Sequence, residues 1–420
     1  MARILGLCRG AILYGNLVMA ATALFVLMAP VYLTIFIHSR RLIRLRRWWS
    51  DLLSGAYLNF AAALLTSPLC GTKVFLYGNS PDILKDRGVL MLCNHRCRVD
   101  WMYSGFCYCA ALASNGQLRF VLKDSIRSVP FFGWVMSAMM YIFLSRKDRE
   151  ADLSHMKQLM KYLLGSGPRP VTFLFPEGTD LTPSSLAKSQ AYAAQHSLPK
   201  MEYVLCPKVS GVEVVLNELR GQGAPCHDIT VAYKDYHVGG PGDTRPSETS
   251  MWTGKFPQEV HINVRRFLVD DIPSERSMLE RWVLGSFTHK EKMLRSFYEN
   301  GSAIPTRAAI KEAAARLADK ASSDEEQDRR LASMEAWSSQ LPLNIPIVRP
   351  MLVVLSWYVC LSYLIYSYSW MRWFLMIITV YSTGARAIGS GFDLIEMYLH
   401  SSIISGSREQ EQAEEGKKDD

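Results

Sequence analysis

Charged residues are missing from four long stretches of this 420-residue sequence, although charged residues make up 20% of the whole. The longest uncharged stretch, Ala11 to Ile37, has 27 residues. The others are Leu52 to Gly71, Pro350 to Met371 and Trp373 to Ala385. About 20 apolar residues are enough to span a bilayer, so these stretches argue against a chain that is soluble throughout. We therefore expect a protein bound to the lipid bilayer through N-terminal and C-terminal membrane helices.

Alternatives remain open for three of the stretches. A cleaved signal peptide competes for the first, because Arg3 and Arg9 precede it. Its apolar core would usually have only about 7–15 residues, which favours an anchor. The second and fourth stretches also suit buried core helices, and the fourth has only 13 residues. The number of membrane crossings therefore stays open.

Positive charge is concentrated between the first two apolar stretches. The formal net charge is +8, and five arginines lie between Arg40 and Arg47, directly before Trp48 and Trp49. Positive segments that flank membrane helices favour the cytoplasmic side, and they also attract anionic lipid head groups. Nucleic-acid binding is another use of such a cluster, but its position between two apolar stretches argues against a nucleic-acid partner.

The nine cysteines do not have the spacing of a zinc site. Cys93 and Cys97 are followed by Cys107 and Cys109, but three of the four lie in apolar surroundings and no matching second pair appears. We therefore expect reduced, structural cysteines and no bound metal.

Between Lys73 and roughly Phe267 the pattern changes to short apolar strands that alternate with helices. This alternation predicts an α/β fold with a largely parallel sheet and flanking helices. The expected domains are a membrane anchor region (1–72), a catalytic domain (73–303), a charged helical linker (304–345), a C-terminal membrane segment (346–404) and a polar tail (405–420). The expected strands are Val89–Cys93, Phe120–Leu122, Tyr141–Leu144, Val171–Phe175, Tyr203–Cys206 and Ile229–Tyr233, and the expected helices are Trp101–Leu112, Asp152–Leu164 and Ala308–Ala321.

The main candidate for catalysis is the segment that runs from Asn94 to Asp100. His95 follows a predicted strand, and side chains at the carboxyl ends of strands line the ligand site in open α/β sheets. A neutral histidine can take a proton from a hydroxyl group. Asp100 can orient and stabilise the imidazole ring from five residues further on, or it can simply cap the following helix.

Three further segments suggest substrate binding. The turn Phe175-Pro176-Glu177-Gly178-Thr179 follows a strand and can present Glu177, which is otherwise a solvated turn residue. Arg146 closes another strand, and arginine suits two-point contacts with phosphate, although surface charge explains it equally well. Lys123 also follows a strand and is a weaker candidate for meeting phosphate.

Together these motifs resemble the glycerolipid acyltransferase superfamily, which includes the 1-acylglycerol-3-phosphate acyltransferases. The order is His-x-x-x-x-Asp, then a strand ending in Arg, then Phe-Pro-Glu-Gly-Thr, at intervals of about 50 and 30 residues, and Val204 to Lys208 resembles a fourth, weaker block. The strings NHRCRVDW, FPEGTDL and HDITVAY are similar to the lysocardiolipin acyltransferase branch. Leu144 stands where many relatives have Ile, which is a conservative difference.

The resemblance implies transfer of a fatty acyl group from acyl-CoA to a lysophospholipid hydroxyl. His95 and Asp100 would be catalytic, with His95 as general base. Arg146, Glu177 and Gly178 would hold the glycerol-phosphate part of the acceptor, with Lys123 as a further phosphate ligand. A thioester is already activated, so no metal or redox cofactor is expected, and acyl-CoA is a co-substrate. Ser104 and Ser145 lack a Gly-x-Ser-x-Gly elbow, which favours direct transfer without an acyl-enzyme.

The acceptor stays open at this stage. Lysocardiolipin, lysophosphatidylinositol and lysophosphatidylglycerol are candidates, and the closest rival is 1-acylglycerol-3-phosphate, which would give phosphatidic acid. A hydrolase or CoA-independent transacylase with the same two residues is a rival of another class. A non-catalytic protein that shapes membranes is a third alternative, which the intact His95, Asp100 and Glu177 disfavour.

The last four residues suggest an address. Lys417 and Lys418 lie three and four places from the end, as in the dilysine signal that returns proteins to the endoplasmic reticulum membrane. A solubilising charged tail is the other interpretation. The signal works only from the cytoplasm, so it predicts an even number of crossings, or none, in the C-terminal segment. It also predicts that the sequon at Asn300 stays unglycosylated.

Overall fold

The computed structural model describes residues 2–78, 80, 82–112, 115–129, 132–234, 246–299, 348–387, 391–401 and 404. The chain forms two compact units that alternate along the sequence. The first contains residues 1–13, 61–113 and 173–345, and the second contains residues 14–60, 114–172 and 346–420. The helices α1 (Ala2–Tyr32) and α2 (Arg40–Thr66) each contribute to both units.

The first unit is built on a mixed sheet with the strand order β1-β7-β6-β2-β5. Strand β1 pairs with β7 and strand β2 with β6 in parallel, whereas β6 and β7 are antiparallel. Every residue of β2, β5 and β6 is buried, as expected for strands covered on both faces. The strands are β1 (Lys73–Gly78), β2 (Leu90–Cys93), β5 (Val171–Leu174), β6 (Pro225–Tyr233) and β7 (Glu259–Leu268).

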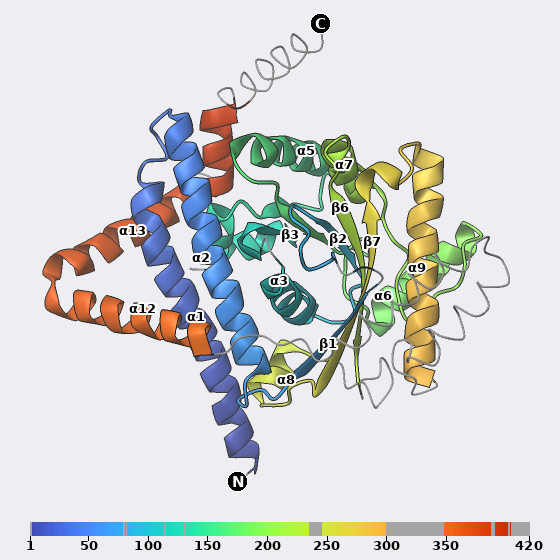
Figure 1. Cartoon of the computed structure of the whole chain (residues 1–420), viewed down its shortest axis with the longest axis horizontal. Coiled ribbons are helices and arrows are strands. Elements are labelled where there is room, and N and C mark those ends of the chain that lie inside the picture. The colour runs from blue at the N-terminus through green and yellow to red at the C-terminus, as the bar shows by residue number, and fades with distance from the viewer. Residues whose placement is uncertain are drawn as a thin grey trace, which may run out of the picture. The chain divides into compact units, whose positions relative to one another are not determined.

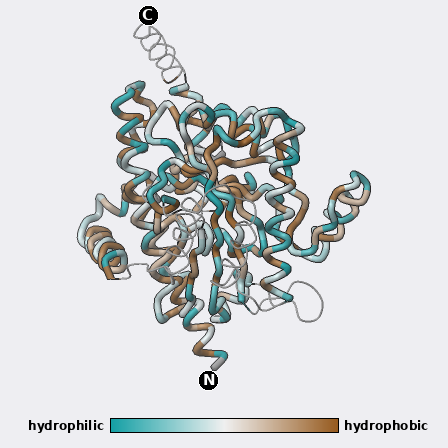
Figure 2. The backbone as a smooth tube through the Cα atoms, turned by 45° about the vertical axis from the view of Figure 1, so that its right-hand side comes forward, coloured by the Kyte–Doolittle hydropathy of each residue, from teal (hydrophilic) through white to brown (hydrophobic). Residues whose placement is uncertain are grey.

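Helices flank this sheet. Figure 1 shows α9 (Arg276–Glu299) beside β7 and β6, and its buried Leu279, Val283 and Phe287 recur at the spacing of one helix face. Figure 2 shows brown and teal alternating along the helices, as expected for helices that bury one side. The other helices of this unit are α3 (Tyr108–Ala110), α6 (Pro183–Gln195), α7 (Ser210–Leu219) and α8 (Glu248–Trp252).

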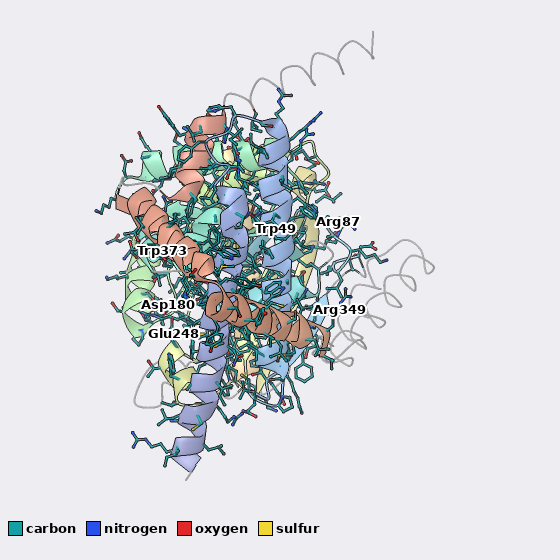
Figure 3. The ribbon with its side chains drawn as sticks, turned by 90° about the vertical axis from the view of Figure 1, so that its left-hand side faces the viewer. Trp49, Arg87, Asp180, Glu248, Arg349 and Trp373 are labelled. Carbon is teal, nitrogen blue, oxygen red and sulfur yellow. The ribbon has the colours of Figure 1, made fainter. Side chains whose placement is uncertain are left out.

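The second unit contains the parallel strands β3 (Leu118–Lys123) and β4 (Ile142–Leu144), with α4 (Phe132–Ala138) before β4 and α5 (Arg149–Ser166) after it. Its C-terminal part contains α12 (Val348–Ser367) and α13 (Ser369–Ala387), which meet at a sharp bend (Figure 1). Figure 3 looks onto these two helices, with Arg349 near the start of α12 and Trp373 on α13.

Two helices in the described part of the chain are long and apolar enough to cross a membrane. They cover Arg3–Tyr32 and Val348–Ser367. A buried core helix or a signal sequence can pass the same test, so this observation is weak support for spanning. The second uncharged stretch falls mostly in α2, where Ala61, Ala62, Ala63 and Leu65 are fully buried.

The predicted α/β class, with a largely parallel sheet and flanking helices, is confirmed. Five of the six predicted strands are present, within a few residues of their expected bounds. The sequence patterns missed β1 and β7. Strand β7 also gives the sheet an antiparallel pair.

The predicted strand Tyr203–Cys206 is wrong, because this segment is irregular. Side chains take the backbone N–H groups that a strand would have used. The N–H groups of Tyr203 and Val204 donate to Glu291, that of Leu205 donates to Glu177, and that of Cys206 donates to Ser189. An apolar run therefore folded as a loop because carboxylate and hydroxyl acceptors replaced the ladder.

The helix predicted for Asp152–Leu164 is present as α5, which is longer at both ends. The helix predicted from Trp101 begins there, but Trp101–Cys107 is a π-helix that continues as the short α3. The predicted linker, with its helix Ala308–Ala321, and the polar tail lie outside the described residues. The domain boundaries stay a prediction.

Candidate active site

The first unit brings together the ends of β2, β5 and β6. Because β2 and β6 are parallel, their carboxyl ends meet at one edge of the sheet. Asn94, directly after β2, is fully buried and extends the pairing with its side chain. Its Nδ2 donates to the carbonyl of Val231 at 3.1 Å, and its Oδ1 accepts from the N–H of Val231 at 2.7 Å. The Asn94 side chain therefore fixes the point at which the chain leaves the sheet, directly before His95.

The His95 ring lies between a carboxylate and an aromatic ring. Its Nδ1 is 2.9 Å from Oδ2 of Asp100, and the ring stacks on Phe175 with centroids 4.1 Å apart. The side chain is 20% exposed, whereas that of Asp100 is fully buried. An Nδ1 proton donated to Asp100 leaves Nε2 as the basic nitrogen. Among the described residues none pairs with Nε2, so this atom can take a proton from a substrate.

Asp100 does not cap the helix that follows it, since its side chain makes no capping hydrogen bond there. Besides His95, its carboxylate accepts from the N–H of Cys97 at 2.9 Å, from the Cys97 thiol at 3.2 Å and from the Tyr233 hydroxyl at 2.7 Å. The geometry therefore favours the interpretation in which Asp100 orients the histidine. A π-helix begins at the next residue, and such turns often accompany functional sites.

Two opposing effects act on the basicity of His95. Burial by itself lowers the pKa of His95, because it disfavours the charged ring. The hydrogen bond and charge of Asp100 act in the other direction, as do the charges of Glu177 and Asp180. Together the acidic groups prevail, and the pKa of His95 lies above its ordinary value.

The Glu177 carboxylate connects its own loop to the backbones of His95 and Leu205. It is buried, and its Oε1 accepts from the N–H of His95 at 2.7 Å while its Oε2 accepts from the N–H of Leu205 at 2.9 Å. Burial raises the pKa of Glu177 to about 7, although these two N–H groups lower it. The carbonyl of His95 accepts from the N–H of Leu181, so the same loop holds the His95 backbone on both sides. A direct contact between Glu177 and the acceptor stays a prediction.

Gly178 makes the tight turn of this loop. Its φ is +76°, a conformation that favours glycine, and a Cβ at this position would lie 3.3 Å from Nζ of Lys208. The N–H of Lys208 donates to the carbonyl of Pro176 at 2.8 Å. The segment that resembled a fourth family block therefore packs against the Pro176–Gly178 turn.

The other two predicted residues, Lys123 and Arg146, belong to the second unit. Lys123 ends β3 opposite Leu144 of β4, and Arg146 follows two residues later, so both lie at the carboxyl end of the same parallel pair. Both side chains are exposed. Arg146 has a φ of 61°, and its N–H donates to Asp152 at 2.7 Å, which holds the turn before α5. Their contribution to substrate binding stays a prediction.

Comparisons with known proteins agree with the motifs. A family model described as Acyltransferase matches residues 75–234, and a second, described as Acyltransferase C-terminus, matches residues 250–321. Lysocardiolipin acyltransferase 1 of Mus musculus is 31% identical over 376 residues, which cover 87% of this chain and 90% of that protein. The chain belongs to the glycerolipid acyltransferase superfamily. The predicted similarity to the lysocardiolipin acyltransferase branch is also confirmed.

Relatives with other names match this acyltransferase as well. A probable 1-acyl-sn-glycerol-3-phosphate acyltransferase 5 of Arabidopsis thaliana is 34% identical over 235 residues, which cover 55% of this chain and 58% of that protein. Lysophosphatidylinositol acyltransferase 10 of Caenorhabditis elegans is 30% identical over 243 residues, with 56% and 59% covered. The three relatives are thus named for different acceptors.

The candidate site of this acyltransferase includes residues that sequence reasoning did not single out. Tyr233 reaches Asp100, Phe175 stacks on His95, and Asn94 anchors the loop. All three lie within the quoted strings, but a string does not show which residue contacts which. Tyr233 lies 133 residues from Asp100 along the chain, so only the pairing of β6 with β2 brings the two together.

Nearby thiols and hydroxyls are poorly suited to nucleophilic attack. Burial raises the pKa of the Cys93 and Cys97 thiols well above the ordinary value, which keeps both protonated. Ser104 is buried, and its hydroxyl donates to the carbonyl of Asp100. None of these three side chains is therefore an activated nucleophile.

Proposed function

We propose that this acyltransferase moves a fatty acyl group from acyl-CoA to a free hydroxyl of a lysophospholipid, with His95 as general base. The observation that carries the proposal is the His95–Asp100 pair, in which Nδ1 is engaged at 2.9 Å and Nε2 has no partner among the described residues. The acceptor hydroxyl gives its proton to Nε2 as its oxygen attacks the thioester carbonyl. The C–S bond then breaks, and the CoA thiolate takes the proton from the imidazolium.

Transfer proceeds directly from donor to acceptor in this proposal. A covalent acyl-enzyme would need an activated serine or cysteine. Cys93 and Cys97 are held as thiols, and Ser104 is engaged with the backbone. No metal is required for the chemistry, because the thioester is an activated donor.

We propose lysocardiolipin as the first acceptor to test, with lysophosphatidylinositol and lysophosphatidylglycerol next. The support is a relative named for lysocardiolipin that aligns over 90% of its length. The second candidate is 1-acylglycerol-3-phosphate, favoured by the Arabidopsis relative. These acceptors share a glycerol-phosphate group, which Arg146 and Lys123 would bind at the carboxyl end of β3 and β4.

The proposed location is the endoplasmic reticulum membrane, with the catalytic residues in the cytoplasm. Two apolar helices support membrane attachment. Helix α12 is hardly buried in the structure, and its Leu352, Leu355 and Val359 side chains are exposed. Large apolar side chains that the protein does not cover are suited to contact with lipid.

The test uses purified protein, one labelled acyl-CoA and a panel of lysophospholipid acceptors. Label should appear in the diacyl or fully acylated product, and folded His95→Ala protein should lose turnover by about 10²–10⁴-fold. Label transfer from a phospholipid donor without acyl-CoA would instead indicate a transacylase. Normal activity of the His95→Ala protein would exclude the proposed mechanism.

A further inference from the structure

Among the described residues that surround Asp100, Tyr233 is the side chain with the shortest contact to the carboxylate. Its hydroxyl lies 2.7 Å from Oδ1, within the range of a charge-assisted hydrogen bond. The other donor to Oδ1 is the Cys97 thiol at 3.2 Å, and a thiol is a weak donor. Oδ2 accepts from His95 and from the Cys97 backbone. Tyr233 is therefore the main donor on the oxygen that does not face the histidine.

The Tyr233 side chain is held in place from several directions. It is fully buried at the last position of β6, and its ring meets that of Tyr103 edge-on with centroids 6.0 Å apart. Its backbone N–H donates to the hydroxyl of Tyr298 at 3.0 Å. Burial raises the pKa of Tyr233 well above its ordinary value, so the hydroxyl keeps its proton at any pH at which the enzyme works.

We propose that Tyr233 is a positioning residue of the acyl transfer, which holds Asp100 toward His95 and sets how strongly His95 Nε2 takes a proton. This inference rests on the proposed function, in which His95 is the base. Tyr233 touches neither substrate in this account and acts only through Asp100.

The direction of the effect follows from the charges around the pair. Asp100, Glu177 and Asp180 raise the pKa of His95. The Tyr233 hydroxyl draws part of the negative charge of Asp100 toward Oδ1, which weakens the pull on the imidazolium. Without this hydroxyl, the Cys97 thiol would be the remaining donor to Oδ1 among the described residues. The imidazolium would be more stable, and the pKa of His95 would rise.

The test compares Tyr233→Phe with Tyr108→Phe by measuring kcat/KM for labelled acyl transfer across the acidic and neutral range. Both tyrosines are fully buried, but the Tyr108 hydroxyl pairs with His227 at 2.8 Å and does not contact Asp100. In Tyr233→Phe the acidic limb of the profile should move to higher pH. At a pH on that limb kcat/KM should fall about tenfold, and most of the loss should recover as the pH rises. Tyr108→Phe should leave the limb where it is in wild type.

A second substitution tests the same hydroxyl without removing it. Replacement of Tyr233 by 3-fluorotyrosine keeps the shape of the ring and makes the hydroxyl a stronger donor, so the acidic limb should move to lower pH. This variant keeps the test available if Tyr233→Phe does not fold. In an Asp100→Asn background, Tyr233→Phe should add little, because residues that act through one another are not additive.

The outcomes separate this inference from the proposed function. If the acidic limb of the kcat/KM profile lies at the same pH in Tyr233→Phe, in the fluorinated protein and in wild type, Tyr233 does not position Asp100. Loss of turnover in His95→Ala would still support the general-base mechanism in that case. If His95→Ala stays active, the general-base mechanism itself is wrong. An equal loss of kcat/KM at every pH in Tyr233→Phe would show a purely structural role and overturn the inference.

Discussion

Replacing Asp100 by asparagine removes one buried negative charge and keeps the size of the side chain. The carboxylate accepts four hydrogen bonds, from His95 Nδ1, the Cys97 N–H, the Cys97 thiol and the Tyr233 hydroxyl. Asparagine has one acceptor oxygen, so at least one of its two sides must present an N–H₂ group to these donors. If the amide nitrogen faces His95, the ring must turn its basic nitrogen toward position 100 and away from the substrate.

The loss of charge can be sized from the contact. His95 Nδ1 and Asp100 Oδ2 are 2.9 Å apart, with the charge centres farther away. Two unit charges about 4 Å apart attract by about 4 kcal/mol at an effective dielectric constant of about 20. An energy of about 4 kcal/mol corresponds to about 10³-fold in rate. Part of this attraction offsets the burial of the ring, so we expect turnover to fall by about 10²–10³-fold.

The pH dependence gives the prediction a second signature. Burial of the ring lowers the pKa of His95, and without the Asp100 carboxylate only the charges of Glu177 and Asp180 oppose this effect. The pKa of His95 should therefore fall. The acidic limb of kcat/KM should therefore move to lower pH while the plateau drops. This shift is opposite in direction to that expected for Tyr233→Phe.

The stability of the folded protein should also depend on pH through the protonation of His95. Because folding raises the pKa of His95 above 6.5, the protonated ring stabilises the folded state fully below that pH, and the stabilisation is lost as the pH rises through the folded-state pKa. Asp100→Asn removes the main cause of the raised pKa. The difference in unfolding temperature between wild type and Asp100→Asn should thus be larger on the acidic side of this window than above it.

The assay is labelled acyl transfer in detergent micelles, with unfolding followed in the same buffers. Asp180→Asn is the matched control, since Asp180 acts on the His95 ring through its charge, whereas Asp100 also forms a hydrogen bond with the ring. It should shift the limb slightly in the same direction and keep turnover within about threefold of wild type. Folded Asp100→Asn with wild-type turnover and an unmoved limb would refute the reasoning.

Three further predictions concern other parts of the chain. Arg146→Lys should raise the acceptor KM more than it lowers kcat, measured by acceptor titration at saturating acyl-CoA, because a point charge replaces a two-point donor. Glu177→Ala should lower the free energy of unfolding by about 2–5 kcal/mol in a denaturant titration, because the buried N–H groups of His95 and Leu205 lose their acceptors. In sealed microsomes a C-terminal epitope should be open to protease and Asn300 should carry no glycan, because the proposed address places both in the cytoplasm.

Each of these three has a control or a contrary outcome. An unchanged acceptor KM in Arg146→Lys would remove Arg146 from the acceptor site, and Arg149→Lys tests whether any nearby arginine gives the same effect. Glu202→Ala alters an exposed carboxylate that pairs with Arg295 at 3.0 Å, and it should change stability little. A protected epitope would overturn the topology and the retrieval signal without affecting the acyltransferase assignment.

The sequence by itself determined the fold class and the identity of the family. The α/β pattern could be predicted from the sequence because buried parallel strands are short apolar runs. Five of the six expected strands are present. The pairing of His95 with Asp100 could also be predicted, because the two lie five residues apart in the sequence. A single loop places His95 Nδ1 2.9 Å from Asp100 Oδ2. The sequence did not reveal β7, whose residues mix apolar side chains with His261, Arg265 and Arg266.

Only the tertiary structure decided what surrounds these residues. Tyr203–Cys206 has a strand-like composition, but Glu291, Glu177 and Ser189 take its N–H groups. Glu177 reaches His95 across 82 residues and Tyr233 reaches Asp100 across 133. Such contacts depend on which strands become neighbours, and local sequence preference does not encode strand order. The contact between His95 and Asp100 could therefore be predicted from one short segment, whereas the groups that hold this pair in place are set by the pairing of distant strands.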